Sequence, residues 1–301
     1  LKKYGWWQNP CEASIEANPG TVDLPKLKAL RQLGFDRISF GVQSLNDAEL
    51  KAIGRVHNAA EALEAIELAK QAGFKRINAD VIYGLPGQTM DSLKETLTRL
   101  CSTGIEHLSV YGLIVEEGTP LQKMTEAGKI ILPDEDEAAD MYEFVQEFLK
   151  TQGFERYEIS NYARGKAYSR HNLVYWNYYP YAAFGAGACG FNGSARFTAA
   201  AKVQNYIQLI QSGGQLYDKE ELPVPVQFEE FMFMNLRKKS GVSLTEAKQR
   251  FGIDVMEKYG AEMKPYIEHN LLGFDKERQK ICLTEAGMEV GNRIFEIFVT
   301  D

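Results

Sequence analysis

In the first 165 residues, short apolar runs alternate with longer segments in which apolar residues recur every three or four positions. The longer segments are typical of amphipathic helices, and four of them end in a glycine followed by an apolar residue, a common helix C-terminus. The short runs predict five strands, at residues 13–18, 37–43, 76–83, 107–111 and 156–159. Because parallel neighbours need a crossover helix, this order predicts an α/β domain with a parallel sheet.

Polar residues recur where the predicted strands end, among them Glu16, Gln43, Asp80 and Tyr111. Several strands that contribute side chains to one rim are typical of (β/α) barrels, whereas the glycine-rich fingerprint of dinucleotide-binding sheets follows none of these strands. Five strands are too few for a closed eight-stranded barrel. We therefore expect a partial (β/α) barrel over residues 1–165.

Asp80 stands in the run 76–83, which we interpret as a buried parallel strand that carries one isolated acid and breaks at Gly-Leu-Pro-Gly. A carboxylate inside such a strand costs several kcal/mol unless a cation or a hydrogen-bond donor meets it. Capping of the next helix is the alternative role, but residues 88–91 already supply that cap. The pattern favours a partner or ligand for Asp80 over a purely structural acid.

The texture changes in residues 166–219. His171 lies near seven aromatic residues between positions 175 and 191, and the end of this segment, at 184–191, is rich in glycine. This composition suits a flat apolar ligand, because small residues let the backbone approach it closely. Ordinary core or interface packing explains the aromatic residues equally well, so both interpretations stay open.

Residues 220–301 predict a smaller, mostly helical domain. Helical periodicity covers 227–237, 244–251 and 255–271, two short strands follow at 272–275 and 280–284, and a last helix is expected over 285–298. Three helices followed by a hairpin resemble a winged-helix module, a class that often binds DNA. With 11 Lys and Arg against 15 Asp and Glu, the module is acidic, which favours a packing or partner-binding role.

Composition narrows the function classes. The chain has 301 residues, is 45% hydrophobic and 25% charged, and carries a formal net charge of −7, so it lacks the basic footprint of a nucleic-acid binder. No apolar run reaches membrane-spanning length. The start, residues 1–7, is too short and too aromatic for a signal peptide, and we expect a cytoplasmic location.

The four cysteines, Cys11, Cys101, Cys189 and Cys282, lie far apart in the chain. Neither a disulfide framework nor a zinc site has such spacing, so we expect reduced thiols. Cys101 falls on a helical pattern and is expected to be buried.

The motifs taken together resemble one family, the oxygen-independent coproporphyrinogen III oxidase-like group of radical S-adenosylmethionine (SAM) proteins. The resemblance runs from about Glu12 to the C-terminus, and the HNxxYW pattern that begins at His171 is similar to that of the haem-chaperone (HemW) branch. Its motifs are EANPG from Glu16, RISFGVQS from Arg37, Arg55, Asp80 with YGLPG, and HNLVYW from His171.

The resemblance implies two ligands. Glu16, Gln43, Arg55 and Asp80 match positions that hold the ribose and methionine parts of SAM, and two further positions, Ile114 and Cys189, match its adenine side. A guanidinium suits the methionine carboxylate, and carboxylates and amides suit the ribose hydroxyls and the amine. For haem, the resemblance implies His171 as iron ligand, Tyr175 and Trp176 as cover for the macrocycle, and a haem-receiving apoprotein as partner.

The family's CxxxCxxC triplet, which ligates a [4Fe-4S] cluster, does not occur in this sequence, and the four spaced cysteines cannot replace it. Either the sequence omits an N-terminal segment or the molecule is a truncated relative, and the cluster is expected only with that segment. Three functions follow: a haem chaperone, a coproporphyrinogen oxidase acting through a radical, or a non-radical module that binds haem or a partner. Whether the chain is a catalyst stays open.

Overall fold

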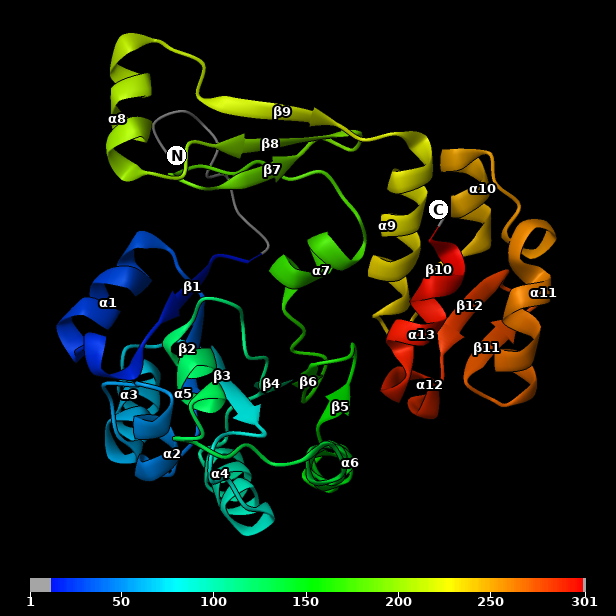
Figure 1. Ribbon diagram of the computed structural model, residues 1–301. Helices are drawn as coiled ribbons and strands as arrows, with labels where there is room; N and C mark the ends of the chain where they lie inside the picture. Colours follow the sequence, from blue (N-terminus) through cyan, green and yellow to red (C-terminus); the bar gives the residue numbers. More distant parts are fainter. Residues whose placement is uncertain (1–11, 300–301) are drawn as a thin grey trace. The chain divides into compact units, whose positions relative to one another are not determined.

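The computed structural model describes residues 12–299, so Cys11 and the start at residues 1–7 lie outside the described part. The chain divides after Tyr168 into two compact units, whose helices and strands Figure 1 labels. Each unit has its own hydrophobic core. The three-part division at residues 165 and 219 stays a prediction.

The first unit contains one six-stranded sheet, with the order β1-β2-β3-β4-β6-β5. Strands β1 to β4 are parallel neighbours in chain order, without the reversal of order that marks a doubly wound sheet. Consecutive parallel winding is the barrel type, so the predicted α/β class is confirmed. The strands are β1 (Ser14–Ala17), β2 (Arg37–Gln43), β3 (Arg76–Tyr83), β4 (His107–Gly112), β5 (Glu155–Arg156) and β6 (Asn161–Ala163).

Helices α1, α3, α4 and α6 cover one face of this sheet (Figure 1), and their apolar residues form one core with those of the strands. Their ends follow local signals. Thr89 caps α4 with its hydroxyl, as the sequence predicts for residues 88–91, and Gly34 ends α1 in the left-handed conformation. The helices are α1 (Leu24–Leu33), α2 (Asp47–Ala52), α3 (Ala59–Gln71), α4 (Met90–Ser102), α5 (Pro120–Glu126) and α6 (Glu135–Thr151), with a 3₁₀ turn η2 (Pro19–Thr21).

The fifth predicted strand is different in the structure. Residues 156–159 do not form one parallel strand, because the chain turns back after Arg156 and β6 pairs antiparallel with both β4 and β5. The buried Glu158 carboxylate closes this turn by accepting from the backbone N–H of Ser160 at 3.0 Å and from the amide of Asn161. A side chain in the middle of the run thus turns one expected strand into a hairpin.

The second unit begins with α7 (Arg170–Trp176) and a small antiparallel sheet of order β7-β8-β9. Its strands are β7 (Cys189–Phe191), β8 (Ala195–Ala199) and β9 (Tyr217–Glu221), and α8 (Val203–Ser212) connects the last two.

The rest of the second unit has the predicted winged-helix outline. Its helices α9 (Val224–Leu236), α10 (Leu244–Phe251) and α11 (Val255–Glu268) pack on a three-stranded sheet of order β10-β12-β11. The strands are β10 (Val242–Ser243), β11 (Leu272–Asp275) and β12 (Lys280–Leu283). The expected last helix over 285–298 is interrupted at Val290 into α12 (Glu285–Glu289) and α13 (Gly291–Phe295), followed by η3 (Glu296–Phe298). Gly291 at the break has low helix propensity.

Within residues 12–299, no helix is both long enough and apolar enough to cross a membrane.

Candidate functional site

The face of the first sheet opposite the helices is polar. The parallel register aligns Glu16, Ser39, Asn78 and His107 side by side across β1 to β4. Two residues further along, Asp80 lies beside Ser109, and Ser109 beside Asn161. Because side chains alternate between the two faces of a strand, all these groups face the same side. The sheet therefore has one apolar face and one face built for polar contacts.

The sequence suggested that Asp80 is an isolated acid in an apolar strand, but it has polar neighbours in the structure. It alternates with Arg76 and Asn78 on the polar face, while Ile77, Ala79 and Val81 fill the core. The expected partners are present, and they are neutral. The Asn78 amide donates to Asp80 Oδ1 at 2.8 Å, and the Ser39 hydroxyl lies 3.3 Å from Oδ2.

Burial raises the pKa of Asp80 above its ordinary value. The hydrogen bonds from Asn78, Ser109 and Ser39 oppose this shift because they stabilise the carboxylate, whereas the neighbouring charge of Glu16 adds to it. A buried acid with a raised pKa and neutral donors is poised to meet a further donor or cation.

Arg55 reaches the same place from the loop between α2 and α3. Its Nη2 donates to Asn18 Oδ1 at 2.9 Å and to the carbonyl of Gly41 at 2.6 Å. A Cβ at Gly41 would lie 2.6 Å from that Nη2, so only glycine leaves room for the guanidinium here. Burial lowers the pKa of Arg55, and the charge of Asp80 opposes that shift.

Gln43 ends β2 in the left-handed conformation, with φ of 66°. The pairing of β2 with β3 shifts between Phe40 and Gln43, so a bulge turns this side chain towards the pocket. A non-glycine residue held in this conformation costs about 1 kcal/mol or more and is often found at functional sites.

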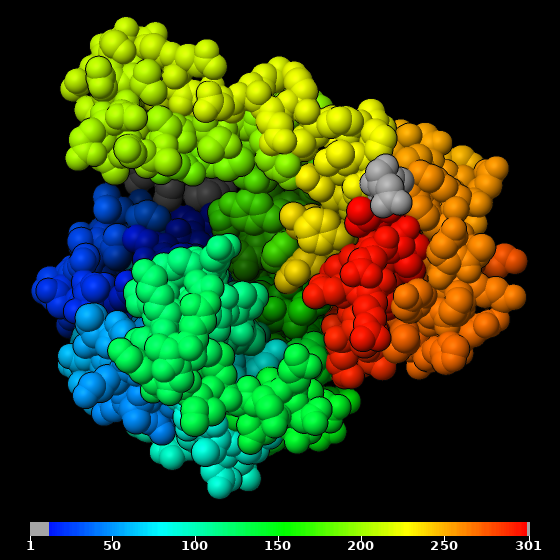
Figure 2. Space-filling model, in the orientation of Figure 1, coloured from blue at the N-terminus to red at the C-terminus, as the bar shows by residue number. Residues whose placement is uncertain are grey.

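These groups line one pocket of about 340 Å³. Four of the six predicted SAM residues lie in it, namely Glu16, Gln43, Arg55 and Asp80, together with Asn18, Thr21, Ser39 and Gly41. Ile114 is not among the lining residues and is 80% exposed, in the segment 113–133 that forms part of the surface of this unit (cyan-green in Figure 2). Cys189 belongs to the second unit, on β7, where its sulfur lies 3.5 Å from the Thr198 hydroxyl.

Sequence reasoning missed the network behind Asp80. Asn78 Nδ2 also donates to Ser39 at 2.7 Å, so its Oδ1 must accept the proton of His107 Nδ1 at 2.5 Å. The other ring nitrogen of His107 then accepts from Tyr157 at 2.8 Å. Burial, together with Arg37 and Arg76, holds the pKa of His107 well below its usual value, so this histidine is a neutral part of the network. The period-two pattern of polar residues in β2, β3 and β4 was the available signal.

The donor set of this pocket fits SAM in kind. It offers two carboxylates, an amide and a guanidinium, the groups suited to a ribose diol and a methionine zwitterion. An iron–sulfur cluster finds no such set, because residues 12–299 contain no group of three or more His, Cys, Asp or Glu side chains placed to hold a metal ion. The three cysteines in this range, Cys101, Cys189 and Cys282, are free thiols, and Cys101 is buried as expected.

Helix α7 carries the predicted haem residues. His171 is exposed, and its Nε2 is hydrogen-bonded to the Tyr175 hydroxyl at 3.0 Å, one helical turn later. The two rings meet edge to face, with centroids 5.0 Å apart, and Tyr175 makes a similar contact with Tyr181 at 4.6 Å. The structure thus brings together His171 and Tyr175 and adds Tyr181, which the sequence did not single out.

Trp176 faces a different direction from this pair. The guanidinium of Arg237, just after α9, lies 4.6 Å from the centre of the Trp176 ring. The next residue, Lys238, is 6% exposed and donates to Asn177 and, at 2.8 Å, to Asn235. Trp176 and Asn177 therefore anchor α7 to the end of α9.

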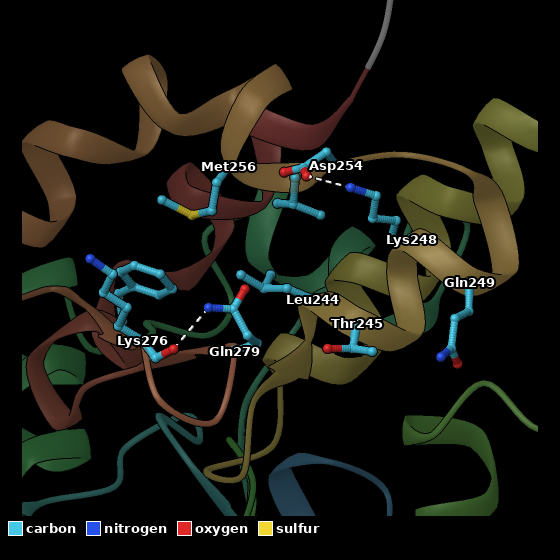
Figure 3. A pocket seen from close by; sticks show the side chains of 10 residues that line it. Leu244, Thr245, Lys248, Gln249, Asp254, Met256, Lys276 and Gln279 are labelled. Atoms are coloured by element: carbon cyan, nitrogen blue, oxygen red, sulfur yellow. Dashed lines mark hydrogen bonds and ion pairs between the residues drawn. The ribbon is translucent and has the colours of Figure 1, made fainter.

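The cations of the winged-helix module are largely engaged. Lys248 points to Asp254 across the turn between α10 and α11, at 2.9 Å, beside a cavity of about 620 Å³ (Figure 3). In the basic cluster at residues 237–239, Arg237 and Lys238 hold α7, and Lys239 pairs with Glu285 at 3.2 Å. Further ion pairs join Arg250 to Glu246, Lys264 to Glu268 and Arg278 to Asp275. With 11 Lys and Arg against 15 Asp and Glu, residues 220–301 lack the excess positive charge that binding to phosphates requires.

Two family models match the chain. The model of the radical SAM superfamily matches residues 8–100, which include β1, β2, β3 and the pocket residues they carry. The model of the HemN C-terminal domain matches residues 222–290, most of the winged-helix module.

The chain is similar to curated proteins over most of its length. It is 37% identical to the heme chaperone HemW of Lactococcus lactis over 290 residues, 96% of this chain and 76% of that protein. The heme chaperone HemW of Bacillus subtilis is also 37% identical, with the same coverage. Radical S-adenosyl methionine domain-containing protein 1 of mouse mitochondria is 38% identical over 64% of this chain and 44% of that protein.

Among solved structures, coproporphyrinogen III oxidase (HemN) from Escherichia coli superposes with a TM-score of 0.79 at 22% identity, over 96% of this chain and 70% of that one. This likeness shows a shared fold. The sequence identity to the two bacterial HemW proteins, sustained over three quarters of their length, goes further: the chain belongs to the HemW family of the radical SAM superfamily.

Proposed function

We propose that this protein is a haem chaperone that binds haem through His171 and binds SAM in the first unit. The observation that carries the proposal is the arrangement on α7: an exposed imidazole, one turn from Tyr175, on a helix that Arg237 and Lys238 hold in place. The names of the relatives support it, since several are heme chaperones at 37% identity or somewhat less.

For SAM, each pocket residue has a task that its chemistry supports. Arg55 is suited to pair with the methionine carboxylate, because a guanidinium can donate two parallel hydrogen bonds. The Asp80 and Glu16 carboxylates are suited to accept from the ribose hydroxyls, and the Gln43 amide can donate and accept. Asn78 and Ser39 orient the Asp80 carboxylate.

For haem, a neutral imidazole nitrogen is a common iron ligand. When bound, haem would supply the iron centre, and the chain would supply the ligand, the apolar contacts and the release to a receiving apoprotein. We place Tyr175 against the macrocycle and keep Trp176 as the anchor of α7, since its ring lies under Arg237. Residues 12–299 contain no set of ligands for an iron–sulfur cluster, and we assign them no role in holding one.

The oxidase alternative has less support. It rests on the likeness to HemN, which at 22% identity concerns the fold alone. A non-radical module that binds haem or a partner would share the α7 site and differ in leaving the SAM pocket unused.

Titration with hemin tests the proposal. The wild-type protein should shift the Soret band of added hemin and retain hemin on a desalting column; His171→Ala should lose the shift and retain hemin more weakly. His269→Ala is the matched control, because His269 is an exposed histidine in the same unit and its Nδ1 is hydrogen-bonded to a local carbonyl, Pro265 O, at 2.7 Å. A His171→Ala spectrum equal to that of the wild type would refute the ligand assignment.

A further inference from the structure

Besides the residues of α7, the second unit contains an apolar pocket. It has a volume of about 490 Å³ and lies between the loop at residues 180–184 and the sheet of β7, β8 and β9. Its walls are mainly aromatic, and they comprise Tyr181, Phe184, Phe191, Phe197 and Tyr217. This volume falls in the range of small-molecule sites, and such sites are mostly apolar with few polar groups.

Backbone contacts hold the pocket open. Tyr181 and Phe191 exchange backbone hydrogen bonds of 2.8 and 2.9 Å, and the Tyr217 hydroxyl donates to the carbonyl of Ala183 at 3.0 Å. A Cβ at Gly190 would lie 3.2 Å from the Tyr181 carbonyl oxygen, so glycine lets the loop come close to β7. The aromatic walls are therefore set by the fold before any ligand arrives, which reduces the ordering cost of binding.

One wall continues into the candidate haem helix. Tyr181 lines the pocket and contacts Tyr175 edge to face, and Tyr175 is hydrogen-bonded to His171. Two ring-to-ring steps, of 4.6 and 5.0 Å, thus separate the pocket wall from the imidazole. A large flat ligand bound at His171 would therefore lie close to this pocket wall.

A cation stands beside the pocket. Lys219 is paired with Phe197 in the register of β8 and β9, and its Nζ lies 5.9 Å from the centre of that ring. Lys219 forms an ion pair with Glu221, but both side chains are at least half exposed, and such pairs contribute little and exchange readily. The lysine can therefore turn to a carboxylate on a ligand.

We infer that this pocket receives the apolar part of a porphyrin, with Lys219 facing its carboxylates. The inference rests on the proposed function and gives it a second contact besides the iron: the macrocycle itself. Aromatic walls suit the π-face or edge of a porphyrin, and a cation suits its anionic substituents. Contact with the ring edge leaves much of the macrocycle for a receiving protein.

Metal-free protoporphyrin IX has no iron for His171 to bind, so its affinity reports on the pocket and not on the iron ligand. Phe184→Asp puts a charge on the pocket wall at a side chain that is 61% exposed, so the fold should tolerate it. Val203→Asp, at 58% exposure on α8 and outside the lining, is the matched control. Fluorescence titration of each variant with protoporphyrin IX, and absorbance titration with hemin, give the dissociation constants.

Phe184→Asp should raise the Kd for both porphyrins about tenfold or more, from the lost apolar contact. His171→Ala should weaken hemin binding and leave protoporphyrin IX unchanged. Lys219→Met should weaken the binding of protoporphyrin IX about threefold and leave the binding of its dimethyl ester, which lacks the carboxylates, unchanged. If Phe184→Asp binds both porphyrins as Val203→Asp does, the pocket inference is wrong while the role of His171 stands. If His171→Ala alone has no effect on hemin, the proposed function fails instead.

Discussion

Gly41→Ala should weaken SAM binding as much as the loss of Arg55 itself. The added methyl group would lie 2.6 Å from Arg55 Nη2 and 3.0 Å from Gln43 Nε2, where ordinary contact needs about 3.4 Å or more. Arg55 is a long side chain, so its guanidinium gives way. It then loses its bonds to Asn18 and to the carbonyl of residue 41, at 2.9 and 2.6 Å.

The expected magnitude follows from this displacement. Hydrogen bonds from a charged donor contribute about 1.5–3 kcal/mol each when well placed, and Arg55 is half-buried, so we take the lower end. A misplaced guanidinium should therefore raise the Kd for SAM about 10- to 100-fold. Loss of the two hydrogen bonds should lower the free energy of unfolding by up to about 3 kcal/mol. No further cost is expected, because Gly41 lies in a strand outside the positive-φ region and the close contact is relieved by a flexible side chain.

Calorimetric titration with SAM measures the Kd in Gly41→Ala, in Arg55→Ala and in the double variant. The double variant should be no worse than Arg55→Ala, because both changes remove one interaction. Gly20→Ala is the control, since its Cβ would meet only His57 Cβ at 3.8 Å, an ordinary contact. Wild-type SAM affinity in Gly41→Ala, or a loss of stability well beyond that of Arg55→Ala, would refute the reasoning.

Three further predictions follow from charged groups. Asp80→Asn should weaken SAM binding about tenfold at neutral pH. The wild type should lose affinity for SAM on acidification, because the pKa of Asp80 is raised and its carboxylate takes up a proton early, and Asp80→Asn should lose this pH dependence. Titrations with SAM between pH 5 and 8 measure both effects, and the same pH profile in the two proteins would contradict the prediction. Burial lowers the pKa of Lys238 to about 8, so the folded protein loses this proton at a lower pH than the unfolded chain does. Between pH 8 and 10.5 the free energy of unfolding of the wild type should therefore rise by about 3 kcal/mol relative to that of Lys238→Met. Urea denaturation across this range measures the difference, and the same pH dependence of the unfolding free energy in both proteins would exclude the shift. The protein should not bind duplex DNA at physiological salt despite its winged-helix outline. Micromolar, salt-sensitive binding, measured by fluorescence anisotropy of labelled duplex DNA, would overturn that expectation.

Local signals in the sequence were enough for most helices. The expected helix at 244–251 coincides with α10, because Ser243 caps its start and Gly252 ends it in the left-handed conformation. Residues 88–91 likewise contain the cap of α4. These signals act over three or four residues, and the hydrogen bonds they make belong to the helix itself.

Side-chain partners across strands were beyond such local reasoning. The alternation of Arg76, Asn78 and Asp80 with apolar residues was present in the sequence, yet nothing local says which residue of the next strand lies opposite. Register decides that Asn78 meets His107 and Ser39, and register depends on the packing of the whole apolar face. The hairpin after Arg156 arose in the same way, from one buried acid.

The motif residues divide along the same line. The spacing of His171 and Tyr175 alone places them on one face of a helix, since residues four apart are neighbours there. The placement of Trp176 under Arg237, 61 positions away, required the tertiary structure, as did the burial of Lys238 against Asn177. The sequence by itself determined the elements, the family and the residues worth testing. Only the folded chain decided which of them meet, because contacts between distant segments are set by the packing of complete cores and not by any short stretch of sequence.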